Sequence, residues 1–181
     1  MALFQPAFSY MIRNEDFHLS GAVVPEPNGG KERFGINSEA NPEAVADGFY
    51  TMTTHAALMY AESLYQSKYW NGRGLDKITS QQVASKLFDV GVNMGNIGVV
   101  DVLHRTHGVD SSHTVSSINA MKPATFLANF IVALKERYHA IVQANPDTYQ
   151  KYLNGWLARA DKLPPADILV TNPDDELIRE A

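Results

Sequence analysis

The stretch "RNEDFHLSG" (residues 13–21) offers the first candidates for chemistry, because Glu15 and Asp16 end a short amphipathic segment ahead of a glycine loop. A carboxylate in this position suits the cleavage of a glycosidic bond. That reaction commonly uses one protonated carboxyl group to donate a proton to the leaving oxygen, and a second carboxylate to activate water or support positive charge. The proton donor needs a raised pKa, which partial burial or a like-charged neighbour provides. Adjacent acids at a helix end are more often solvated surface, so further motifs must decide.

Four other motifs follow in order: "PEPNGGKERFGIN", "YW" at 69–70, "LFDVGVNMG" at 87–95 and "GWLAR" at 155–159. Together with "NED", over about residues 4–163, they resemble the glycoside hydrolase 108 muramidases of phage endolysins and secretion-associated murein hydrolases. The resemblance implies a lysozyme-type N-acetylmuramidase that hydrolyses β-1,4 bonds between N-acetylmuramic acid and N-acetylglucosamine in peptidoglycan. Such an activity serves bacterial cell lysis.

The resemblance also implies catalytic residues. Glu15 falls on the family's catalytic glutamate, although the family's Gly-Gly-Tyr has become 16–18 (Asp-Phe-His) and the loop before "GG" is about three residues longer. Glu26 best matches the family's Asp before Pro-Gly-Gly. Glu32 takes the place of a Thr that lies close to the attacking water in lysozyme-like sites. Either Glu26 or Glu32 could therefore be the second catalytic group.

Three further residues are candidates for substrate binding: Phe34, Tyr69 and Asn93. Each also has a structural interpretation. Phe34 could pack the β-lobe, Tyr69 could cap a long helix, and Asn93 could hydrogen-bond a loop. Asp89 lies one helical turn before Asn93 and shares its face, and we favour a structural role for it.

Two alternative functions remain open on the sequence. Loss of the Gly-Gly-Tyr segment would fit a non-catalytic peptidoglycan-binding protein, and a lytic transglycosylase would need no second carboxylate. The segment "HRTHGVDSSH" holds three histidines and an aspartate that could ligate zinc, but a His-Glu-x-x-His motif is absent. We therefore expect no metal and no cofactor.

Apolar periodicity predicts that helices position these residues. We expect helices over 4–14, from 53 to about 70, over 79–95, 97–108, 122–146 and 147–163, with an irregular β-hairpin within 17–37. The fold class is mainly α, a lysozyme-like helical domain with a small N-terminal β-lobe. One domain is expected over 1–163, with a catalytic part to about residue 95, a helical peptidoglycan-binding part over about 96–163, and an acidic tail from 164 to 181.

The charge excludes some partners. Five acids and one arginine give residues 163–181 a charge of −4, so the rest of this 181-residue chain of net charge −5 is nearly neutral. A neutral body argues against sequence-independent binding of nucleic acid. No apolar run is long enough to span a bilayer, and "MALFQPAFSYMIRNEDF" lacks the pattern of a signal peptide. We expect a monomer without stable membrane insertion, made in the cytoplasm, that reaches periplasmic peptidoglycan strands by holin-type release or another export route.

Overall fold

The computed structural model describes residues 1–26 and 29–166. Its α-helices are α1 (Phe4–Glu15), α2 (Pro42–Ala46), α3 (Thr54–Tyr65), α4 (Gln81–Arg105), α5 (Thr114–Ala120), α6 (Pro123–Ala144), α7 (Pro146–Tyr149) and α8 (Leu153–Asp161). Three short strands, β1 (Val24–Pro25), β2 (Lys31–Arg33) and β3 (Ile36–Asn37), form one antiparallel sheet in that order. The mainly α, lysozyme-like class with a small N-terminal β-lobe is confirmed. The acidic tail expected over 164–181 lies outside the described residues from 167 onward.

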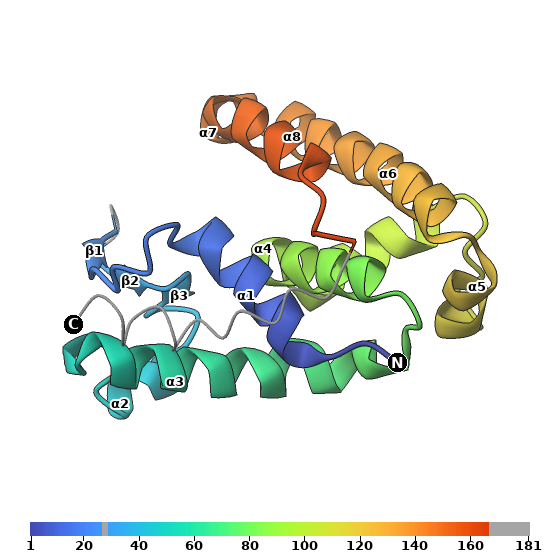
Figure 1. Ribbon diagram of the computed structural model, residues 1–181. Helices are drawn as coiled ribbons and strands as arrows, with labels where there is room; N and C mark the ends of the chain where they lie inside the picture. The colour runs from blue at the N-terminus through green and yellow to red at the C-terminus, as the bar shows by residue number, and fades with distance from the viewer. Residues whose placement is uncertain (27–28, 167–181) are drawn as a thin grey trace.

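Helix α4 is the centre of the molecule. Figure 1 shows α1 lying across α4, with α6 and α8 on one side and α3 on the other, while the sheet lies beside the end of α1. The apolar face of α1 is buried, and the Phe4 ring contacts Phe88 of α4 and Trp70 at centroid distances of 5.7 Å each. Packing of α1 on α4 therefore fixes where the last residue of α1 lies.

Most of the expected helices are present, with changes of detail. The segments 79–95 and 97–108 are one helix, α4, broken by a kink at Gly95, where φ is 76° and ψ is 169°. The long helix from Thr54 ends at Tyr65 and continues as a π-helical turn over Gln66–Trp70. Its N-cap is Thr53, whose hydroxyl accepts a hydrogen bond from the amide of Ala56. Two short helices, α2 and α5, were not predicted.

A buried arginine holds the β-lobe on the helices. Arg33 is 4% exposed, and its Nε donates to the carbonyl of Gly21 at 2.7 Å. Its Nη1 donates at 2.9 Å to the carbonyls of Phe49 and Met52, in the segment that leads into α3. Since these backbone groups belong to two separate segments, Arg33 fixes the sheet relative to the start of α3.

The C-terminal helices are joined by an aromatic cluster. Trp156 of α8 stacks on Tyr138 of α6 with ring centroids 5.2 Å apart, and Tyr149 and Tyr152 pack beside it. The region expected as one helix over 147–163 is divided into α7, a 3₁₀ turn over Gln150–Tyr152 and α8.

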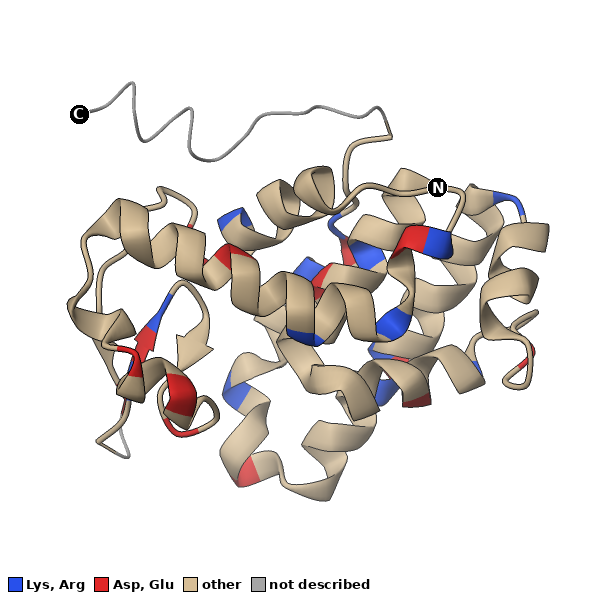
Figure 2. Cartoon of the chain, turned by 90° about the horizontal axis from the view of Figure 1, so that it is seen from below, with Lys and Arg blue, Asp and Glu red and all other residues tan. Residues whose placement is uncertain are grey.

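Figure 2 shows acidic and basic positions interleaved over the helices in that view, without a gathering of Lys and Arg on one surface.

Candidate active site

Glu15 is the last residue of α1 and lies between the C-terminal helices and the β-lobe. Its side chain is 16% exposed, and Oε1 accepts a hydrogen bond from Nη2 of Arg159 at 2.5 Å. The other oxygen, Oε2, lies against the turn at Gly35, where an added Cβ would be 2.9 Å away from it. The two oxygens of Glu15 therefore have different surroundings: Oε1 contacts the guanidinium of Arg159, and Oε2 lies against the backbone turn at Gly35.

Asp16 has a different role from its neighbour. Its Oδ2 accepts hydrogen bonds from the Ser20 hydroxyl at 3.0 Å and from the amide of Gly21 at 2.8 Å. These bonds fold the loop that leads from α1 into the β-lobe. The two adjacent carboxylates thus differ in role: Asp16 holds the loop, and Glu15 lies in a half-buried, charged site.

The sheet places Glu26 and Glu32 on the same face of the first hairpin. Glu32 pairs with Val24 across β1 and with Asn37 across β3, and the amide of Glu26 donates to the carbonyl of Gly30 at 2.9 Å. Because side chains alternate along a strand, Glu26 and Glu32 are diagonal neighbours. Burial raises the pKa of Glu32, and the charges of Glu26 and Glu15 raise it further. The carboxyl group of Glu32 therefore interacts electrostatically with both Glu15 and Glu26.

The three candidate substrate-binding residues occupy different environments. Phe34 is 2% exposed, so its ring belongs to the core. Tyr69 is half-buried, with its ring 5.8 Å from that of Tyr65 and below the guanidinium of Arg73. Asn93 accepts a hydrogen bond from the Tyr138 hydroxyl at 2.8 Å, which joins α4 to α6. Of these, Tyr69 and Asn93 keep some exposed surface.

Arg159 is the site residue that sequence reasoning missed. Its Nη2 also donates to Oδ1 of Asp89 at 2.8 Å, and Asp89 has a fully buried side chain. Asn14 donates to the same Oδ1 at 2.9 Å. Burial alone would lower the pKa of Arg159, but the charges of Asp89 and Glu15 raise it above its ordinary value. The motif "GWLAR" pointed to this arginine, but nothing in the sequence places it beside Glu15, 144 residues away.

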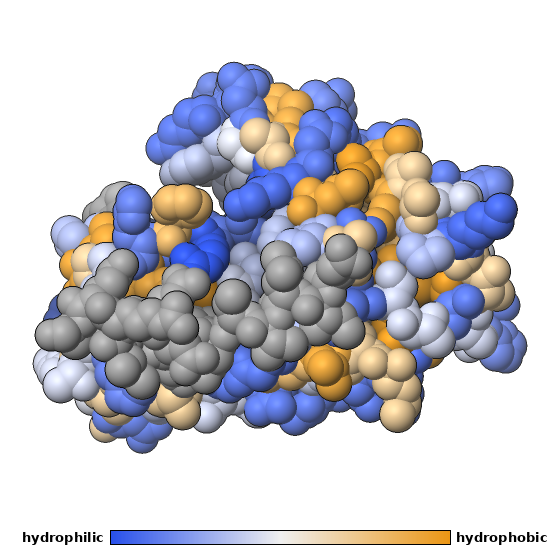
Figure 3. Space-filling model, viewed as in Figure 1, coloured by the Kyte–Doolittle hydropathy of each residue, from blue (hydrophilic) through white to orange (hydrophobic). Residues whose placement is uncertain are grey.

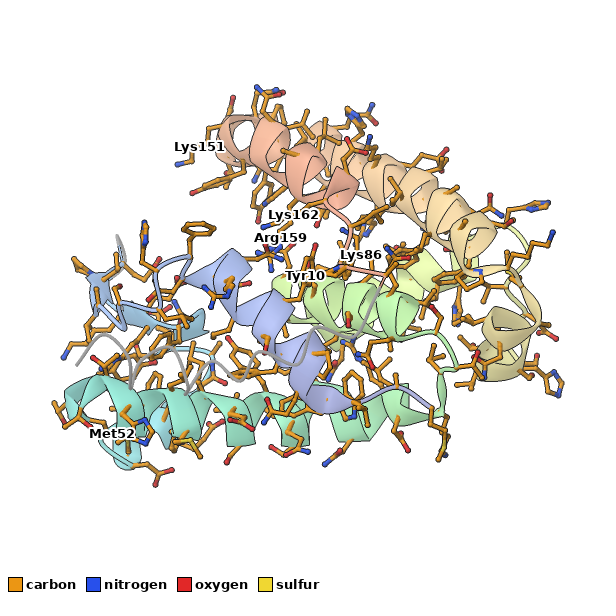
Figure 4. All side chains as sticks on the ribbon, viewed as in Figure 1. Tyr10, Met52, Lys86, Lys151, Arg159 and Lys162 are labelled. Carbon is orange, nitrogen blue, oxygen red and sulfur yellow. The ribbon has the colours of Figure 1, made fainter. Side chains whose placement is uncertain are left out.

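A buried lysine fixes the end of α8 that carries Arg159. Lys86 of α4 is 0% exposed, and its Nζ donates at 2.8 Å to the carbonyls of Arg159 and Lys162. The Tyr10 hydroxyl donates to the Lys162 carbonyl as well, at 3.0 Å. Figure 4 shows Arg159 and Lys162 extending from the end of α8 toward α1, with Tyr10 and Lys86 close by. The last turn of α8 is therefore held on both α1 and α4.

The surface is hollowed where these elements meet. Figure 3 shows the hollow between the β-lobe and the helices α7 and α8, with hydrophilic side chains in it. A separate cavity of about 320 Å³ lies beside α1, and its lining includes Tyr10, Arg13 and Lys162 but none of the three candidate catalytic glutamates. The hollow beside the β-lobe is thus the candidate substrate cleft.

Residues 1–26 and 29–166 contain no group of three or more His, Asp or Glu side chains able to hold a metal ion. In the histidine-rich segment, Nδ1 of His113 instead pairs with Oδ2 of Asp110 at 3.1 Å. None of the helices described is both long and apolar enough to cross a bilayer.

The first comparison concerns the segment that holds the hairpin. Residues 21–95 match the family model described as Glycosyl hydrolase 108. The chain is a glycoside hydrolase. The match confirms the resemblance drawn from the motifs and implies a glycan substrate. It includes Glu26, Glu32, Tyr69 and Asn93, whereas Glu15 precedes it.

The fold also has a solved counterpart. The structure of Brucella abortus SagA is similar with a TM-score of 0.57 and 18% identity, covering 87% of this chain and 92% of that one. At this identity the likeness concerns the fold alone, and it extends well beyond the segment matched by the family model. No curated protein matches the chain.

Proposed function

We propose that this glycoside hydrolase is an N-acetylmuramidase that cleaves the β-1,4 bond between N-acetylmuramic acid and N-acetylglucosamine in peptidoglycan, for bacterial cell lysis. The observation that carries the proposal is the position of Glu15. It is half-buried at the end of α1, facing a hairpin whose two carboxylates lie on one face and whose Glu32 feels its charge. Two carboxyl groups across a cleft are the usual catalytic pair for hydrolysis of a glycosidic bond.

In the proposed reaction Glu15 is the general acid and Glu32 the second group. The proton of Glu15 passes to the glycosidic oxygen as the bond from that oxygen to C1 breaks. The oxygen of a water molecule bonds to C1, and one proton of that water passes to the carboxylate of Glu32. The raised pKa of Glu32 favours this step, since a more basic carboxylate takes up the proton more readily. Glu26, on the same face, adjusts that basicity by its charge.

Residues 96–163 are proposed to add grip on the glycan strand. Support comes from the aromatic cluster at the C-terminal helices, where Tyr152 is 47% exposed and stacks on Trp156. Aromatic rings with one exposed face suit the apolar faces of sugar rings. We further propose a soluble monomer that meets periplasmic peptidoglycan after holin-type release or another export route.

Mass spectrometry of soluble products from purified Gram-negative sacculi tests this function. A muramidase releases muropeptides with reducing ends. Products with 1,6-anhydro ends would show a lytic transglycosylase instead. Sacculi that bind the protein but stay intact would show a non-catalytic binding protein.

A further inference from the structure

The pair Arg159–Asp89 combines a basic group from α8 with an acidic group from α4, directly beside Glu15. Arg159 bridges the two carboxylates through the same Nη2 atom, and its Nε lies 3.5 Å from Oδ2 of Asp89. The side chain of Asp89 is 0% exposed and that of Arg159 is 17% exposed. This is a preformed, largely dry ion pair in contact with the proposed acid.

We propose that Arg159 is a positioning residue for Glu15, and that Asp89 serves as its counter-charge, so that α8 completes the active site. The inference rests on the proposed function for its catalytic consequence. A guanidinium only donates hydrogen bonds, so the oxygen that it contacts, Oε1, is the unprotonated one. The catalytic proton is then carried by Oε2, which lies on the side of the β-lobe.

The counter-charge resolves a conflict within the site. A lone arginine in contact with a carboxylate favours its ionised form strongly, which would disable a general acid near neutral pH. Asp89 offsets that charge with two contacts to the same guanidinium. Arg159 can thus hold Oε1 in place while Asp89 shares its charge. Asn14 and the buried Lys86 keep Asp89 and the end of α8 in register.

Other charged and titratable groups also face Glu15 and must be accounted for. Glu32 on β2 and Tyr65 on α3 both interact electrostatically with Glu15. These groups are unchanged by substitutions at Arg159 and Asp89. Any difference between the two variants therefore reports on the ion pair itself, together with the groups near it, which are Lys86, Lys162, Tyr10 and Tyr138.

The test compares Arg159→Met, Arg159→Lys and Asp89→Asn in the full chain by two measurements. The first is an NMR titration of the Glu15 carboxyl carbon, which needs no activity. The second is the pH profile of sacculus hydrolysis, with kcat and KM separated. Arg105→Met is the matched control, because Arg105 pairs with Asp101 on the exposed end of α4, away from Glu15.

We expect opposite shifts. Arg159→Met raises the midpoint of the Glu15 titration by about one pH unit or more, and Asp89→Asn lowers it by a similar amount. In each variant the alkaline limb of the pH–activity profile moves in the same direction as the titration midpoint. In Arg159→Met, kcat falls at least tenfold with little change in KM. Arg159→Lys restores part of the midpoint but less of kcat, because a flexible ammonium lacks the rigid guanidinium that contacts Asp89 through both Nε and Nη2.

Midpoints that stay unchanged, or that move in the same direction, would overturn the inference. So would an equal effect of Arg105→Met. If every variant and the parent leave sacculi intact while the titration midpoints still move apart, the proposed function fails and the electrostatic pairing stands. If the parent hydrolyses sacculi and the midpoints do not move, the pairing fails and the function stands.

Discussion

The glycine at position 35 is predicted to be essential for the position of Glu15. Its φ is +75°, a left-handed conformation, and a Cβ added there would lie 2.8 Å from Cγ of Glu15 and 2.8 Å from the Tyr65 hydroxyl oxygen. Real Cβ atoms essentially never approach so closely. Tyr65 cannot yield easily, because it is buried and its hydroxyl donates to the carbonyl of Phe34 at 2.9 Å. Glu15 must therefore move.

The magnitude follows from two effects. A non-glycine residue in the left-handed region costs about 1–2 kcal/mol, and overpacking a tight site costs about 1–3 kcal/mol. Gly35→Ala should lower the free energy of unfolding by about 2–5 kcal/mol. We also expect kcat/KM on sacculi to fall at least tenfold, because a displaced carboxyl group cannot reach the glycosidic oxygen.

Gly48→Ala is the matched control. Gly48 has nearly the same φ, +73°, but the nearest atom to an added Cβ is the Thr51 hydroxyl oxygen at 3.6 Å, an ordinary contact. This variant should lose only the backbone cost, about 1–2 kcal/mol, and keep its activity. Urea denaturation measures the stability of each variant, and initial rates of sacculus hydrolysis measure its activity. If Gly35→Ala loses no more activity than Gly48→Ala, the turn does not position Glu15 and the reasoning is refuted.

Three further predictions concern charges and hydrogen bonds. Glu26→Gln removes a charge that raises the pKa of Glu32, so the acidic limb of the activity profile should move to lower pH; an abolished activity would instead make Glu26 the second catalytic group. Burial lowers the pKa of Lys86 to about 8 from 10.5, so the unfolded chain binds an extra proton between these values and stability rises with pH there. Between pH 8 and 10, the difference in the free energy of unfolding between wild type and Lys86→Met should change by about 1–3 kcal/mol. A difference that stays constant over this range would contradict the prediction. Tyr138→Phe removes the hydrogen bond to Asn93 and should lower the free energy of unfolding by about 1 kcal/mol, measured by thermal unfolding, with unchanged products of sacculus hydrolysis. No measurable loss of stability would show that this hydrogen bond does not stabilise the packing of α4 on α6.

Local patterns predicted much of this fold. The helix expected over 122–146 is α6, whose first turn holds Pro123 and whose buried face includes Phe126, Leu127 and Phe130. The helix expected over 79–95 ends at Gly95, which is the site of the kink in α4. These features depend on periodicity and on the conformation of single residues, both of which are visible in sequence.

Features that depend on tertiary contact were not predicted. Helix α5 has a largely polar sequence, and it is fixed by the burial of Ile118 and by a hydrogen bond from the Asn119 side chain to the carbonyl of Lys77. The β-lobe depends on Arg33, a charged residue that a pattern of burial would place outside. Neither contact produces a periodic pattern in the sequence.

The candidate site divides in the same way. The motif and the helix end indicated Glu15, and hairpin alternation accounts for Glu26 and Glu32 sharing a face. The partnership of Arg159 with Glu15 and Asp89 joins three helices over long sequence separations. Only the packing of α8 on α6 and α4 brings it about.

The central claim, that Glu15 donates the proton, is tested most directly by comparing Glu15→Gln with Glu136→Gln on purified sacculi. Glu136 lies exposed on α6, so its variant controls for the loss of one carboxylate. Mass spectrometry should detect reducing-end muropeptides from the parent and from Glu136→Gln, and none from Glu15→Gln, whose fold is verified by circular dichroism. Equal digestion by both variants would contradict the account and place the acid at another residue.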